Sequence, residues 1–126
     1  MINNSSVVLR AETSAGRVLL TGDVELAAQA DLLAEGVDLR ADVLKVPHHG
    51  SRYSLPQFLA AVRPRTALIS VGAGNGYGHP SKSTVDVLGT MGVLVTRTDV
   101  DGDTAVLPGG SGPAVARRGE PRGPPR

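Results

Sequence analysis

Residues 42–71 read DVLKVPHHGSRYSLPQFLAAVRPRTALISV, and the fold class follows from this stretch. It contains two apolar runs, at residues 42–46 and 66–71, that have the length and composition of buried strands. Between them, residues 56–62 predict a short helix that is capped from Ser54. A helix between two strands is typical of layered α/β proteins.

The same alternation of strands and helices continues in both directions along the chain. Residues 6–12 and 17–21 predict a hairpin of two strands around turn residues 13–16. Apolar spacing and capping residues predict a helix at 24–35 closed by Gly36 and a helix from Ser81 or Ser83 to Met91. Two strands at 93–98 and 104–107 are predicted around a turn at Asp101-Gly102. The predicted order is β-β-α-β-α-β-α-β-β, which is an α/β architecture.

Composition limits the classes of protein to which the chain can belong. Its 126 residues allow one domain of ordinary size, and 2% aromatic residues require a core of Val, Leu and Ala. The absence of cysteine excludes disulfide scaffolds, thiol nucleophiles and Cys-ligated zinc. A net charge of +1 gives no general attraction to nucleic acid. No apolar run approaches the roughly 20 residues that span a bilayer and no signal peptide is recognisable, so the sequence leaves the localisation open.

Residues 108–126 differ in composition from the rest of the chain, because 14 of these 19 residues are Pro, Gly or Arg. Such a stretch cannot bury enough apolar area to offset its chain entropy, so we expect a disordered tail. Four arginines make the tail basic. A solvated end is the simpler interpretation, and an arm that contacts phosphate groups is the alternative.

Three short polar segments follow predicted strands, and they are Thr21-Gly22-Asp23, Pro47-His48-His49-Gly50-Ser51 and Gly78-His79-Pro80. They contain every histidine of the chain. Loops at strand ends converge over the edge of an α/β sheet, and imidazole and carboxylate groups are ligands for zinc, manganese or iron. The segments therefore predict a metal-dependent site with Asp23, His48, His49 and His79 as candidate catalytic residues.

Each of these residues also has a simpler structural interpretation. Asp23 directly precedes a predicted helix and is placed to cap its N-terminus. Neighbouring side chains on an extended segment point in opposite directions, so only one of His48 and His49 is expected to face a given site. The other histidine then orients the first or contacts substrate. His79 can be an ordinary loop residue.

The loop before His79 has glycine at every second position from 72 to 78, which lets the backbone approach a ligand or simply makes a flexible loop. Asn75 and Tyr77 in this loop, together with Lys45 and Ser51, are weaker candidates for contacts with substrate. The chain has neither the Gly-Lys-Ser/Thr end of a phosphate-binding loop nor a Gly-x-Ser-x-Gly nucleophile elbow.

Three motifs in a fixed order, LLTGD at residues 19–23, KVPHHGS at 45–51 and YGHP at 77–80, resemble the metallo-β-lactamase-like domain of ComEC-type competence proteins. The resemblance covers about residues 3–107. It implies an αββα sandwich with two divalent metal ions, zinc or manganese, between the sheets, and nuclease or phosphodiesterase activity on DNA during uptake. It implies that Asp23 bridges the ions and that His48 or His49 lies with His79 at or next to them. Proteins of this family lie in the bacterial cell membrane.

The chain departs from the family pattern because the His-x-His-x-Asp-His motif is absent. We therefore expect residues 1–107 to form a partial domain that resembles the C-terminal half of the sandwich, followed by the tail at 108–126. Such a chain is a truncated hydrolase domain, weakly active or inactive alone, that a missing N-terminal half or a second copy would complete. The alternative is a non-catalytic remnant or accessory module that binds DNA or a partner chain. A superfamily hydrolase of small substrates is a third interpretation.

Overall fold

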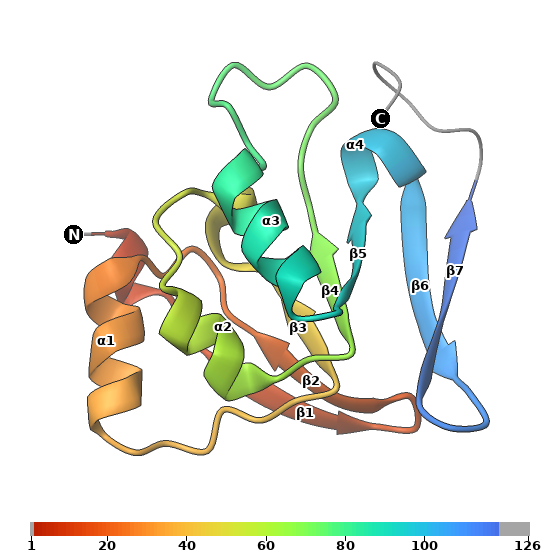
Figure 1. The fold of residues 1–126 in the computed structure, drawn as a ribbon, viewed down its shortest axis with the longest axis horizontal. Helices are drawn as coiled ribbons and strands as arrows, with labels where there is room; N and C mark the ends of the chain where they lie inside the picture. The colour runs from red at the N-terminus through yellow and green to blue at the C-terminus, as the bar shows by residue number, and fades with distance from the viewer. Residues whose placement is uncertain (1, 119–126) are drawn as a thin grey trace.

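The structure, a computed structural model, describes residues 2–118 (Figure 1). Its regular elements are η1 (Asn3–Ser5), β1 (Leu9–Thr13), β2 (Gly16–Leu20), α1 (Leu26–Ala34), β3 (Val43–Lys45), η2 (Pro47–Gly50), α2 (Pro56–Val62), β4 (Thr66–Ile69), α3 (Lys82–Thr90), β5 (Leu94–Arg97), α4 (Thr98–Asp101), β6 (Asp103–Pro108) and β7 (Pro113–Arg118). The mixed α/β class predicted from the sequence is confirmed. No helix within the described residues has the length and apolar character needed to cross a membrane.

The first five strands form one sheet in the order β1-β2-β3-β4-β5. β1 and β2 make the predicted antiparallel hairpin, and β2 to β5 run parallel to one another. Figure 1 shows α1, α2 and α3, the helices that connect the parallel strands, on one side of the sheet. Because the parallel strands point the same way, the loops that follow them meet at one edge of the sheet.

The core lies between the sheet and these helices. Its central members are completely or almost completely buried, and they are Leu19, Leu44, Phe58, Leu59, Val62, Ala67, Ile69 and Leu88. Phe58 adds an aromatic ring to a core that otherwise consists of Leu, Val, Ile and Ala, as the composition predicts. Burial of each large side chain contributes about 1.5–3 kcal/mol, so this core holds the strand ends in fixed positions.

The opposite face of the sheet carries the alternate residues of the same strands. Leu9, Leu20 and Leu94 on this face are exposed, whereas Val43 and Thr66 at its centre are buried. The helices α1, α2 and α3 do not cover this face (Figure 1). The five-stranded sheet is thus mostly parallel with α1, α2 and α3 on one side, and the αββα sandwich implied by the resemblance stays a prediction.

The C-terminal part differs from the prediction. Where a hairpin around Asp101-Gly102 was expected, the chain forms the short helix α4, and β6 pairs with β7 in a separate two-stranded sheet. Residues 113–118 of the stretch expected to be disordered are therefore a strand. Val106 opposite Val115 shows the strand alternation that the Pro and Gly content conceals. Residues 119–126, which were also expected to be disordered, lie outside the residues that the structure describes.

The arginines of β7 lie next to carboxylates. Arg117 contacts Asp101 at 3.3 Å, and Arg118 lies 3.8 Å from Asp103. The Arg65 guanidinium donates to the carbonyl of Ser111 and so links the β6–β7 turn to the start of β4. The described part of the tail therefore presents less uncompensated positive charge than its sequence suggests.

The start of α2 is not capped as predicted. The Ser54 hydroxyl donates to the carbonyl of Ser51 at 3.1 Å, and Leu55 is the N-cap residue. The Gln29 side chain of α1, which is completely buried, forms the hydrogen bonds to this segment instead. Its Oε1 accepts from the Leu55 amide at 2.7 Å, and its Nε2 donates to the Tyr53 carbonyl at 3.2 Å. One buried amide therefore fixes the position of this segment relative to α1.

Candidate functional site

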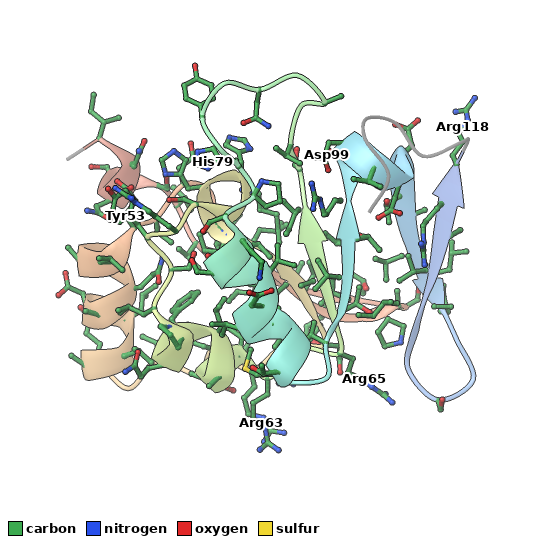
Figure 2. All side chains as sticks on the ribbon, turned by 45° about the horizontal axis from the view of Figure 1, so that its top comes forward. Tyr53, Arg63, Arg65, His79, Asp99 and Arg118 are labelled. Atoms are coloured by element: carbon green, nitrogen blue, oxygen red, sulfur yellow. The ribbon has the colours of Figure 1, made fainter. Side chains whose placement is uncertain are left out.

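Polar side chains gather at the edge of the sheet where the parallel strands end. They come from three loops, which are residues 21–23 after β2, η2 after β3 and residues 70–80 after β4. The rings of His48, His49 and His79, here called the histidine cluster, have centroids 5.4–6.4 Å apart. Figure 2 shows His79 at the end of the molecule opposite Arg63 and Arg65.

His48 and His49 lie in a tight turn and not in an extended segment. Their φ angles are 49° and 57°, which places both residues in the left-handed region. Such a conformation costs roughly 1–2 kcal/mol for each non-glycine residue, so the surrounding contacts must maintain it. The His48 amide donates to the carbonyl of Gly22 at 3.0 Å and ties the turn to the end of β2. The expectation that the two side chains point in opposite directions is wrong, because both rings lie near His79.

His49 is oriented by a backbone carbonyl. Its Nδ1 lies 2.8 Å from the carbonyl oxygen of Ser70. A carbonyl only accepts, so Nδ1 carries the hydrogen and the Nε2 of the neutral ring has a lone pair. This Nε2 lies 3.7 Å from Oδ1 of Asp23. Nε2 of His49 and Oδ1 of Asp23 are therefore neighbours, at a distance longer than a hydrogen bond.

His48 faces a carboxylate that the sequence analysis missed. Its Nδ1 lies 3.4 Å from Oε2 of Glu25, and both side chains are largely buried. Within residues 2–118 this Nδ1 has no partner in hydrogen-bonding geometry. The position of Glu25, two residues after Asp23 in a segment that leaves a strand end, is the signal that could have identified it.

His79 is positioned by the loop before it. The Asn75 Oδ1 accepts from the amides of Tyr77 and His79 at 3.2 Å each, and its Nδ2 donates to two loop carbonyls at 2.9 Å each. The Tyr77 ring stacks on the His79 ring at 5.9 Å between centroids. Burial, and then the neighbouring His48 and His49, lower the pKa of His79, which favours its neutral form. Asn75, expected as a substrate contact, is engaged with the loop backbone.

Asp23 does not cap the following helix. α1 has Glu25 as its N-cap, and Oδ1 of Asn4 accepts from the amides of Glu25 and Ala28 at 2.9 and 3.4 Å. The Asp23 amide donates to the Ser6 hydroxyl at 3.1 Å. The helix start is thus satisfied by Asn4, and the Asp23 carboxylate is left beside the histidine cluster.

Lys45 and Ser51, the other predicted contacts, differ in accessibility. The Lys45 Nζ donates to the carbonyl of Gly22 at 2.8 Å. Burial lowers the pKa of Lys45, and the charge of Asp23 partly counteracts this effect. Ser51 is buried, and its hydroxyl accepts from the Tyr53 amide at 3.1 Å. Lys45 therefore lies close to the candidate ligands, whereas Ser51 supports the backbone beneath them.

The donor atoms at this edge suit zinc or manganese, but they do not form a complete metal site. Imidazole nitrogen and carboxylate oxygen are the ligands that these ions take. Asp23 Oδ1 and His49 Nε2 are close enough to share one ion with ligand bonds of about 2.0–2.2 Å. Across residues 2–118, no three His, Asp or Glu side chains are arranged to hold a metal ion. The described residues thus supply one pair of neighbouring ligand atoms with two further imidazoles alongside.

Several known proteins contain a segment similar to this chain. The chain is 41% identical over 101 residues to ComE operon protein 3 of Bacillus subtilis, 36% identical over 105 residues to Recombination protein 2 of Haemophilus influenzae and 35% identical over 102 residues to Competence protein ComA of Neisseria gonorrhoeae. The similarity covers 79–82% of this chain but only 13–15% of the length of these three relatives. No protein family model matches the chain.

Proposed function

We propose that the chain is part of a DNA-uptake protein and carries one side of a divalent-metal centre that hydrolyses phosphodiesters. The name of the Neisseria relative refers to competence and that of the Haemophilus relative to recombination, both processes that act on DNA. The similarity includes most of the chain, and the candidate ligands lie within its ordered body. Because the chain spans only a small part of these relatives, the activity is proposed for the larger assembly to which the chain contributes.

The orientation of His49 is the observation that carries this proposal. Its Nδ1 is held by the Ser70 carbonyl, and its Nε2 lies 3.7 Å from Oδ1 of the Asp23 carboxylate. Nε2 and Oδ1 in this position attract a positive charge between them, which a divalent ion supplies in this proposal. A histidine whose second nitrogen donates to a backbone carbonyl is also the usual arrangement of a metal ligand.

Each residue of the site has a role in this proposal. Asp23 and His49 hold the ion, and His48 and His79 are the further imidazoles. A bound zinc or manganese ion lowers the pKa of water and offsets negative charge on a phosphoryl group. Glu25 keeps the His48 ring in its orientation through the contact at Nδ1. His79, whose pKa is lowered, stays neutral and is able to accept a proton.

The ligands on this chain are too few for a two-metal centre. The His-x-His-x-Asp-His motif is absent, and the described residues offer one adjacent ligand pair. We therefore expect the isolated chain to be weakly active or inactive, with the remaining ligands supplied by another segment or a second copy. Lys45, next to Asp23, adds a positive charge for a substrate phosphate.

The test is the metal content of the purified chain after loading with zinc or manganese and dialysis. We expect the wild type to retain metal and the variants Asp23→Asn, His49→Ala and His79→Ala to lose it. Glu12→Gln, a change to a paired carboxylate at the other end of the sheet, is the matched control and should retain metal.

Two outcomes would contradict the proposal. One is that the Asp23 and histidine variants keep as much metal as the wild type. The other is that the wild type retains no metal but binds DNA in a salt-sensitive manner, which would favour a non-catalytic binding module. Cleavage of a DNA oligonucleotide is measured in parallel to check the expected weak activity.

A further inference from the structure

The exposed aromatic surface of the chain lies next to the histidine cluster. The sequence has two Tyr, one Phe and no Trp. Phe58 is completely buried in the core, whereas Tyr53 and Tyr77 are 42% and 83% exposed. Tyr77 stacks on His79, and Tyr53 lines a pocket together with Glu25, the neighbour of His48 in the cluster. Both tyrosines therefore flank the candidate site.

Tyr77 is presented to solvent by an ordered set of hydrogen bonds. Its amide donates to Oδ1 of Asn75 at 3.2 Å, and the same side chain also bonds to the backbone of His79. The planes of the Tyr77 and His79 rings differ by only 18°. The two rings are thus nearly parallel and offset, and the high exposure of Tyr77 leaves a flat aromatic surface open beside the cluster.

Tyr53 lies at an open pocket that Glu25, the neighbour of His48, also lines. The pocket has a volume of about 420 Å³ and is lined by Asn4, Glu25, Leu26, Ala27 and Tyr53. Buried Gln29 fixes its wall, because Nε2 donates both to the Tyr53 carbonyl at 3.2 Å and to the Val24 carbonyl at 3.0 Å. Leu26 is exposed and gives the pocket an apolar side. A pocket of this size accommodates a flat organic ring.

Arg52 places a positive charge beside Tyr53. Its guanidinium carbon lies 4.9 Å from the centroid of the tyrosine ring, and Nη2 donates to the tyrosine hydroxyl at 2.8 Å. In the part of the chain that the structure describes, Arg52 makes no ion pair with a carboxylate. Its charge is therefore available to a phosphate group, which a guanidinium binds well.

We propose that Tyr53 and Tyr77 are stacking surfaces for unpaired nucleobases beside the histidine cluster, with Arg52 contacting the backbone phosphate. Aromatic rings combined with basic side chains are how proteins hold single strands without sequence preference. Bases in a duplex are already stacked on one another and reach such rings only if they are flipped out. The chain therefore binds single-stranded DNA in preference to duplex DNA. This inference rests on the proposed function for the position of the reacting phosphate near His79.

The test is the binding of a fluorescein-labelled oligothymidylate to the full chain in EDTA, measured by fluorescence anisotropy. EDTA removes metal, so neither cleavage nor metal binding contributes to the signal. We expect Tyr53→Leu and Tyr77→Leu each to weaken binding about 5- to 100-fold, as for the loss of one base–aromatic stack. Tyr53→Phe and Tyr77→Phe keep the ring and should bind like the wild type. Val37→Ala changes a residue that is 47% exposed and lies outside the site, and it is the matched control.

Two further measurements separate base stacking from attraction to phosphate. An abasic strand of equal length should bind the wild type no better than the normal strand binds the Leu variants. Because the chain has no Trp, its tyrosine emission comes from Tyr53 and Tyr77 and should be quenched by the oligothymidylate. Leu variants that bind like the wild type, or equal affinities for normal and abasic strands, would overturn this inference. If Asp23→Asn retained as much metal as the wild type, only the proposed function would be overturned.

Discussion

Carboxylates lie beside basic side chains at both ends of the parallel strands, but Asp23 and His49 at the carboxyl end are farther apart than the partners at the amino end. At the amino end, an open pocket of about 490 Å³ contains Arg17 bound to Glu12 at 2.8 Å. Asp42 in the same pocket accepts from the Arg17 amide at 2.8 Å. At the carboxyl end, Nε2 of His49 and Oδ1 of Asp23 are 3.7 Å apart, which is longer than a hydrogen bond. Figure 2 shows these ends by Arg63 and Arg65 on one side and His79 on the other.

The difference means that neither pocket volume nor charge alone distinguishes the candidate site from the amino end. The larger pocket lies at the amino end, where hydrogen bonds already satisfy the carboxylates. Asp38 is an example, since its hydrogen bond with Arg10 lowers the pKa of its carboxyl group. Polar groups that lack such partners reduce the stability of the free chain, and a ligand that completes them recovers this free energy.

The largest effect is expected from Gly50→Ala, which tests how tightly the carboxyl end is packed. Gly50 has φ 81°, and a Cβ at this position would lie 2.6 Å from the Cβ of Pro80. The left-handed conformation and the overpacking together should lower the free energy of unfolding by about 2–5 kcal/mol. Gly36→Ala is the matched control, because Gly36 has φ 69° but nothing within 4 Å, and it should cost about 1–2 kcal/mol. Equal losses in urea unfolding would contradict close packing beneath the histidine cluster.

The next largest effect on the free energy of unfolding is expected when one carboxylate at each end of the sheet is removed. Asp42→Ala leaves the Arg17 amide without its acceptor and should lower the free energy of unfolding by about 1–3 kcal/mol. Asp23→Ala removes a carboxylate without such a bond and should cost less than about 1 kcal/mol while it abolishes metal retention. Urea unfolding and metal analysis of both variants measure these outcomes. A larger stability loss for Asp23→Ala would show that this end, too, is structural.

A pH dependence should distinguish the carboxyl end when metal is absent. Burial and the neighbouring imidazoles lower the pKa of His79 below the ordinary 6.5, so the folded chain binds this proton less readily than the unfolded chain. The free energy of unfolding should therefore decrease as the pH falls through about 6.5 towards the lower pKa of the folded state. His79→Gln should weaken this dependence in urea unfolding at several pH values. An NMR titration that places the His79 pKa at or above 6.5 would refute the prediction.

The smallest effect is expected for Glu12→Gln at the amino end. The pair with Arg17 is exposed on both sides, so solvent screens it and its loss should change the free energy of unfolding by less than about 0.5 kcal/mol. Thermal unfolding of the variant at low and high salt provides the measurement. A substantial loss that disappears at high salt would mean that charge pairing at this end matters more than its exposure indicates.

Much of the parallel α/β unit was predictable because its signals are local. The strands at 43–45 and 66–69 and the helix at 56–62 each follow from an apolar run and a turn residue close by in the sequence. The grouping of three polar segments at one edge also follows, since loops after parallel strands must meet there. Which of His48 and His49 binds an ion stays a prediction, because both rings lie in the cluster.

Other features depend on contacts between distant residues and were not predictable. The pairing of residues 103–108 with 113–118 relies on a weak alternation within a stretch dominated by Pro, Gly and Arg. The left-handed turn at His48 and His49 runs against residue preference and is maintained by the bond to the end of β2. The sequence position of Glu25 makes it a candidate for this edge of the sheet, but its contact with His48 depends on that turn and was not predictable.

The side chain of Asn75 also sets a chemical lifetime for the loop that it organises. An asparagine followed by glycine, as in Asn75-Gly76, is prone to lose its amide group by attack of the next backbone nitrogen, and asparagine is a thermolabile residue. Conversion to aspartate would replace the two bonds donated to the Gly72 and His79 carbonyls by repulsion between oxygen atoms. The loop would then release Tyr77 and His79 while the core stays folded. In stored protein, irreversible chemical damage should therefore appear first at this loop.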